Sequence, residues 1–70
     1  MDRTRVSSNN IRSIGYDAKN QVLEVEFLNG GIYQYFQVPE QVRNRLMAAS
    51  SKGRFFGANI RDKYRTRKIR

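Results

Sequence analysis

Residues 30–39 constrain the fold most, because a turn, a strand and a helix start must follow one another within this stretch. Gly30 accepts the positive φ of a tight turn. Pro39 suits the first turn of a helix, where its missing N–H would be unpaired anyway. Between them, Tyr33 and Tyr35 are two residues apart, so on a strand their side chains share one face. We expect the rest of the chain to be organised around this strand.

Two further strands are expected before it. Residues 22–28 alternate apolar and acidic side chains, which is typical of a strand with one buried and one solvated face. Residues 11–17 show a weaker alternation, and a polar turn follows them. The pair Asn29-Gly30 is a strong hairpin signal. Together with a strand over residues 32–37, these segments predict a three-stranded antiparallel meander.

Helical spacing begins after Pro39. The apolar residues that follow it predict a helix ending near residues 50–53, where serines and a glycine disfavour its continuation. Beyond that break, Phe56, Ile60 and Tyr64 recur at every fourth position. This recurrence predicts a second short helix.

These elements predict one small α+β domain, in which the first helix packs on one face of the meander. A chain of 70 residues holds a single core, and residues 1–5 and 65–70 are expected to be flexible tails. The chain has no cysteine, which fits a reducing compartment. It also has neither the apolar run of a membrane span nor a signal-peptide pattern. We therefore expect a cytoplasmic protein.

Basic side chains are concentrated at the end of the chain. The formal net charge is +8, from 14 Lys and Arg against 6 Asp and Glu, and residues 51–70 hold eight of the bases but one acid. Ten of the bases are arginine, whose planar guanidinium suits phosphate. This pattern predicts a polyanionic partner, RNA or another nucleic acid, and the alternative is a solvated tail. The residues expected to contact phosphate are Lys52, Arg54, Arg61, Lys63, Arg65, Arg67 and Lys68.

Four short patterns follow one another along the chain: Ser7-Ser8-x-x-Ile11-x-x-Ile14-x-Tyr16-Asp17, Leu23-x-Val25-x-Phe27-x-x-Gly30, Tyr33-x-Tyr35-x-x-Val38-Pro39, and Ala49-Ser50-x-Lys52-Gly53-x-Phe55-Phe56. Their order and spacing over residues 6–64 resemble the KTSC domain. That family is named for the C-terminal appendage of some bacterial lysyl-tRNA synthetases and also occurs as a free-standing short protein. The resemblance implies an intracellular meander-plus-helix module and RNA binding. We expect no synthetase catalytic domain before it, so the resemblance does not imply aminoacylation.

Nothing in the sequence predicts catalysis. There is no histidine and no cysteine, and no nucleophile has a base close to it in the sequence pattern. Glu24 and Glu26 share a strand face and would suit acid–base chemistry or an oxygen-liganded metal. Two acids on the polar face of an amphipathic strand are more often solvated. We expect a non-enzymatic binding module with no cofactor and no metal.

Two features leave alternatives open. Tyr33 and Tyr35 could stack on bases, but a small sheet needs aromatic packing, and we favour a role in the core. The serine-lysine-glycine turn at residues 51–53 could hold a phosphate through its N–H groups and Lys52, or it could be an ordinary connection between helices.

The alternative function is protein binding. Ile32 and Phe36 fall on the strand face opposite the tyrosines. A three-stranded sheet covered on one side leaves this face open. Apolar residues there would suit a protein partner or self-association.

Overall fold

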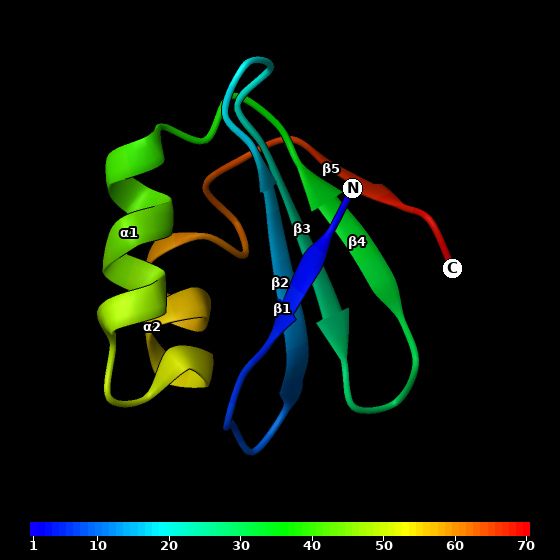
Figure 1. Ribbon diagram of the computed structural model, residues 1–70, viewed down its shortest axis with the longest axis vertical. Coiled ribbons are helices and arrows are strands. Elements are labelled where there is room, and N and C mark those ends of the chain that lie inside the picture. Colours follow the sequence, from blue (N-terminus) through cyan, green and yellow to red (C-terminus); the bar gives the residue numbers. More distant parts are fainter.

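Five strands form one antiparallel sheet in the computed structural model, which describes residues 1–70. The order of the strands in the sheet follows their order in the sequence: β1 (Arg3–Arg5), β2 (Ile11–Asp17), β3 (Val22–Phe27), β4 (Ile32–Tyr35) and β5 (Thr66–Lys68). Two helices, α1 (Glu40–Ala48) and α2 (Lys52–Asn59), lie between β4 and β5 in the chain. Both pack on the same face of the sheet (Figure 1). The predicted α+β architecture is confirmed, with two strands more than predicted.

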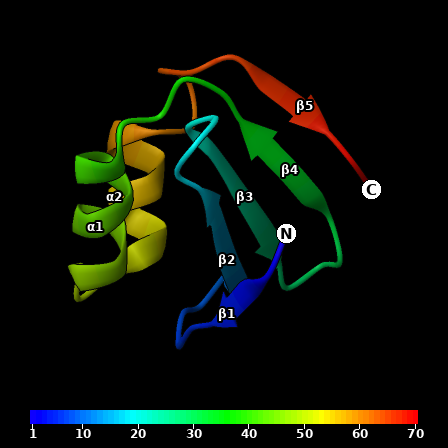
Figure 2. The ribbon, with the colours of Figure 1, turned by 45° about the horizontal axis from the view of Figure 1, so that its top comes forward.

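The additional strands are the two edges of the sheet, and they come from the segments expected to be tails. Arg3 of β1 pairs with Gly15 of β2, and Thr66 of β5 pairs with Tyr35 of β4. Figure 2 shows β1 and β5 on opposite sides of the central meander. Each is three residues long, and β5 is exposed throughout. Backbone pairing holds them, so neither carries the apolar alternation that identifies a buried strand.

The helix-facing side of the sheet carries the core. Val25 pairs with Tyr33 and Leu23 with Tyr35, so both tyrosines lie on this side, as predicted. Tyr35 is 4% exposed and belongs to the core, whereas Tyr33 is half-buried at its margin. The buried cluster consists of Ile11, Ile14, Leu23, Val25, Tyr35, Val38, Leu46, Phe56 and Ile60.

Both helices form close to where the sequence predicts them. Pro39 is the residue before α1, with an extended backbone, and the helix begins at Glu40. α1 ends at Ala48, before the predicted end near residues 50–53. α2 begins at Lys52 and ends at Asn59, so Ile60 and Tyr64 of the predicted recurrence lie beyond it. Leu46 of α1 and Phe56 of α2 are the side chains that these helices bury in the core. Neither helix has the length and apolar character needed to cross a bilayer.

The approach of β1 to β2 requires a glycine. A Cβ at Gly15 would lie 2.6 Å from the backbone oxygen of Asp2 and 2.9 Å from Cγ of Arg3. Gly15→Ala should therefore displace β1 and lower the free energy of unfolding by about 1–3 kcal/mol, measured by urea denaturation. The matched control is Gly57→Ala on α2, where the nearest atom is a flexible arginine tip at 3.6 Å. That change should stabilise by about 0.5–1 kcal/mol, and equal effects of the two would contradict the packing described.

Candidate nucleic-acid interface

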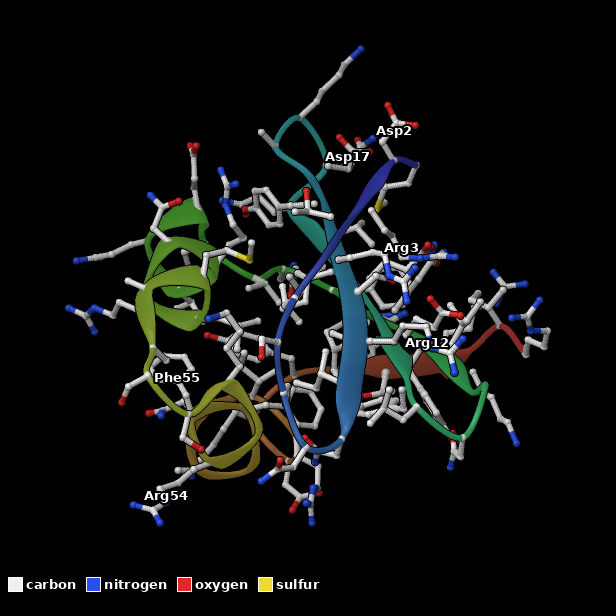
Figure 3. The ribbon with its side chains drawn as sticks, turned by 60° about the horizontal axis from the view of Figure 1, so that its bottom comes forward. Asp2, Arg3, Arg12, Asp17, Arg54 and Phe55 are labelled. Carbon is white, nitrogen blue, oxygen red and sulfur yellow. The ribbon has the colours of Figure 1, made fainter.

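The structure divides the seven predicted phosphate-contacting residues among several surfaces. Lys52 and Arg54 lie in the first turn of α2. Arg54 extends from the helix away from the sheet (Figure 3). Lys52 is half-buried, and its Nζ donates a hydrogen bond to the carbonyl of Ala49 at the end of α1, over 3.0 Å. Arg61 is exposed, just beyond the end of α2.

The other four belong to the connection after α2 and to β5. Lys63 and Arg65 are exposed in the connection. Lys68 lies on the helix side of the sheet, with its Nζ 6.0 Å from the centroid of the Tyr33 ring. Arg67 lies on the opposite side. The C-terminal basic segment is therefore an ordered element with two faces, and its charges do not form one patch.

Lys52 and Arg54 line a polar groove that the sequence did not predict. We call it the serine groove, and its walls are residues 7–10 from the β1–β2 loop and residues 50–54 from the α1–α2 turn. Figure 1 shows these two connections at the same end of the molecule. The groove has a volume of about 580 Å³, and none of its lining residues is hydrophobic. None is acidic either, so the charge along its walls is purely positive.

The geometry of the serine groove depends on Gly53 and Ser8. A Cβ at Gly53 would collide with the side-chain oxygen of Asn10, so glycine allows α2 to begin against the loop. Ser8 Oγ accepts hydrogen bonds from the N–H groups of Asn10 and Ile11, each over 3.3 Å. These contacts fix the loop beside the start of α2.

The start of α2 has backbone N–H groups without a capping side chain, an arrangement that favours an anion. Ser51 is the residue before the helix, and its side chain makes no capping hydrogen bond. No acidic residue lies in the first turn. The first N–H groups of a helix have no partner within it, and the positive end of the helix dipole lies there. The serine groove therefore presents backbone donors and two cationic side chains to the same space.

A second groove, with aromatic walls, lies next to the first. We call it the aromatic groove; Phe27, Leu28, Tyr33, Tyr35, Phe56 and Arg61 line it together with three asparagines. Its volume is about 590 Å³. Two of the asparagines, Asn9 and Asn10, also line the serine groove, so the two grooves adjoin. The carbonyl of Asn10 accepts a hydrogen bond from the N–H of Leu28 over 2.9 Å, which ties the shared loop to the β3–β4 turn.

The opposite side of the sheet is closed by ion pairs. Arg3 Nη1 donates to a carboxylate oxygen of Glu24, and Gln34 Nε2 donates to the other oxygen over 2.9 Å. Glu26 accepts a hydrogen bond from Ser13 Oγ over 2.8 Å. Arg3 projects on the side of the sheet away from the helices (Figure 3). The expectation of solvated carboxylates is therefore wrong for Glu24, which is 7% exposed and whose carboxylate contacts the side chains of Arg3 and Gln34.

These carboxylates should make the stability of the domain depend on acid pH. Burial raises the pKa of Glu24, but hydrogen bonds from Gln34 and Arg3 and the charge of Arg3 outweigh it, so the pKa lies below its ordinary value. The hydrogen bond from Ser13 is the largest cause that lowers the pKa of Glu26. Groups with a depressed folded pKa stabilise fully above the unfolded pKa of about 4.3 and lose that contribution as the pH falls through the folded pKa. The urea midpoint should therefore be constant near neutrality and fall below about pH 4.3.

The double variant Glu24→Gln, Glu26→Gln is the control for that dependence. Its midpoint should fall less steeply with acid than that of the wild type. Asp17 retains a lowered pKa through hydrogen bonds from Asn20 and Lys19, so part of the dependence should persist. If the midpoint of the double variant fell as steeply with acid as that of the wild type, Glu24 and Glu26 would not be the cause of the pH dependence.

The apolar residues of the alternative interface are largely covered. Ile32 is 6% exposed and Phe36 is half-buried. The N–H of Phe36 donates to the carbonyl of Arg65, so the chain leading into β5 runs alongside it. Little apolar surface of Ile32 and Phe36 is therefore exposed for a protein partner on this face of the sheet.

Comparison with known proteins places the chain in a family. The family model described as the KTSC domain matches residues 7–64. The chain belongs to the KTSC domain family. The crystal structure of a KTSC domain protein from Yersinia pestis is 49% identical in sequence and superposes with a TM-score of 0.96, covering 99% of this chain and 97% of that one. The fold described above is therefore the fold of this family.

Two further relatives show where KTSC sequences occur. An uncharacterized protein of Stutzerimonas stutzeri is 46% identical over 56 residues, which make up 80% of this chain and 79% of that protein. A lysine–tRNA ligase of Nostoc punctiforme is 40% identical over 55 residues, which make up 79% of this chain but 10% of the ligase. The likeness to the ligase is confined to a small segment of it.

The residues that sequence reasoning missed are those of the loop and of the β3–β4 turn. The sequence analysis gives residues 7–10 no role in binding, although Ser7 and Ser8 open the family pattern. The sequence predicts a turn at Asn29, and the structure shows that Asn29 also lines the aromatic groove. The family pattern could have indicated the groove, because its first part, from Ser7, and its last part, residues 49–56, both contribute residues to the serine groove.

Proposed function

We propose that this KTSC domain binds RNA and holds phosphate groups in the serine groove. The observation that carries the proposal is the composition of that groove. It joins residues 7–10 to residues 50–54, and it contains two cations and no acidic or hydrophobic side chain. A groove of this composition favours a multiply charged anion over an apolar ligand.

The chemistry of the walls suits phosphate in particular. Arg54 offers the planar donor fork that matches two phosphate oxygens, and Lys52 adds a second positive charge. The N–H groups at the start of α2 have no side-chain cap, and the residues that carry them line the groove. Ser7 and Asn9 supply neutral donors on the opposite wall.

Two further basic residues on the helix side of the sheet would extend the contact along a nucleic-acid chain. Arg61 lines the aromatic groove, and Lys68 lies beside Tyr33, one of its lining residues, on the helix side of the sheet. Phosphate contacts give affinity without reading sequence, so selectivity would be for shape or for single strands. The ligase relatives are named for tRNA, which agrees with an RNA ligand. Binding without catalysis, in the cytoplasm, belongs to the same proposal.

Anisotropy with labelled tRNA, single-stranded RNA and duplex DNA tests the proposal. At low salt the two RNAs should bind at least tenfold more tightly than the DNA. For about four phosphate contacts, raising the salt from about 50 to about 200 mM should weaken RNA binding roughly 10- to 100-fold. Equal and weak binding to all three nucleic acids would mean that the domain attracts polyanions only nonspecifically, and it would overturn the proposal.

A further inference from the structure

The aromatic groove has walls that a planar aromatic ligand would complement. Phe27, Phe56 and Tyr35 form a chain of edge-to-face contacts, with ring centroids 5.4 and 5.3 Å apart. Tyr33 meets Phe27 edge-on at 5.7 Å and is half-buried. Leu28 at the rim is 46% exposed. Tyr35 and Phe56 are nearly buried and form the floor, so Phe27, Tyr33 and Leu28 give the groove its exposed apolar surface. The volume of the groove is of a size common for small-ligand sites.

Polar groups without internal partners surround this surface. The Oδ1 atom of Asn29 accepts a hydrogen bond from the N–H of Gly31, and that of Asn10 accepts one from Ser8. Their amide nitrogens take part in none of the side-chain hydrogen bonds of the domain, and neither does the side chain of Asn9. Side-chain amides of this kind match the hydrogen-bonding edges of nucleobases.

The hydroxyl of Tyr35 is the clearest of these groups. Tyr35 is 4% exposed, yet its hydroxyl makes no hydrogen bond within the chain, whereas the hydroxyl of Tyr16 donates to the carbonyl of Val38 over 2.5 Å. Only two side-chain polar atoms in the domain are fully buried and also lack a hydrogen bond, and these are the Nε atoms of Arg12 and Arg43. The Tyr35 hydroxyl is not one of them, so it retains some exposure, and Tyr35 lines the aromatic groove. Burial raises its pKa to about 12, so it keeps its proton at neutral pH and can donate.

We propose that the aromatic groove receives one unpaired base of the RNA, while the adjoining phosphate is held in the serine groove. This inference rests on the proposed function and names the form of RNA that the site takes. Asn9 and Asn10 line both grooves, so one nucleotide can span the boundary. The cations Arg61 and Lys68 flank the aromatic walls and complement a charged backbone rather than an uncharged apolar peptide. A paired base is stacked on its neighbours and cannot enter.

Three RNAs of equal length separate this inference from the proposed function. One is a short single strand, the second is the corresponding duplex, and the third is a single strand of abasic nucleotides, which keeps the phosphates and lacks the bases. The wild type should bind the first roughly 5- to 150-fold more tightly than the abasic strand, since stacking of one base contributes that much. It should also prefer the single strand to the duplex.

The variants Tyr35→Phe and Tyr33→Val test the groove itself. Tyr35→Phe removes a hydroxyl that has no internal partner, so the fold should be unaffected and the affinity for the single strand should fall several-fold. Tyr33→Val should abolish most of the preference over the abasic strand. The matched control is Tyr64→Phe, outside both grooves, which should leave every affinity unchanged.

The outcomes are distinct. Salt-sensitive binding with equal affinity for all three RNAs, unaffected by Tyr35→Phe, would overturn the base site and leave RNA binding in place. Salt-sensitive binding to none of them would overturn the proposed function, and the base site with it.

Discussion

Phe56→Ala should remove most of the stability of this domain. Phe56 is 3% exposed and makes edge-to-face contacts with both Phe27 and Tyr35. Truncation of a buried phenylalanine costs about 3–5 kcal/mol. Domains have about 0.05–0.15 kcal/mol of stability per residue, so a chain of this length has little to spare. Urea denaturation followed by circular dichroism should show a midpoint close to zero denaturant.

Two variants make that prediction specific. Phe55→Ala alters the neighbouring residue of α2, which is half-buried, and it should cost clearly less. Phe56→Leu keeps an apolar side chain but loses both aromatic contacts, so it should cost less than Phe56→Ala. If Phe55→Ala proved the more damaging change, α2 would bury a different face from the one described.

The double variant Lys52→Gln, Arg54→Gln should weaken RNA binding at least tenfold at about 50 mM salt. It removes both cations of the serine groove while keeping polar side chains there. Each phosphate contact with a single strand contributes about 0.7 to the salt slope, so the slope should fall by about 1.4. Anisotropy across a salt series measures both quantities.

Arg5→Gln, Arg67→Gln is the control of equal charge. Arg5 pairs with Ser13 and Arg67 pairs with Gln34, on the side of the sheet away from the helices. Both are exposed and take no part in the ion pairs of the domain. This variant should lower affinity only slightly. Equal losses in the two double variants would mean that net charge, and not the groove, governs binding.

The central part of the fold was predictable from local signals. The alternation over residues 22–28 and the Asn29-Gly30 pair fixed the β3–β4 hairpin, and Pro39 located the start of α1. The face assignment of Tyr33 followed from the period of two in a strand. Each of these signals acts within a few residues, which is why the sequence displays it.

The edge strands and the grooves were not predictable in this way. β1 is held by backbone pairing and by the contact of Arg3 with Glu24, a residue 21 positions away. The serine groove forms only because Gly53 lets α2 approach Asn10 across the fold. The sequence showed the basic residues but not their placement. Arg67 and Lys68 are neighbours on β5, so their side chains lie on opposite faces of the sheet. Tertiary pairing decides these features.

Chemical-shift mapping tests the central claim most directly. The uniformly labelled domain would be titrated with a short single-stranded RNA, and every backbone amide followed by two-dimensional NMR. We expect the largest shifts in residues 7–10 and 50–54, with a second set in residues 27–33 and at Arg61. Shifts confined to the Arg3 and Glu24 side of the sheet, or spread evenly over all basic residues, would contradict the account.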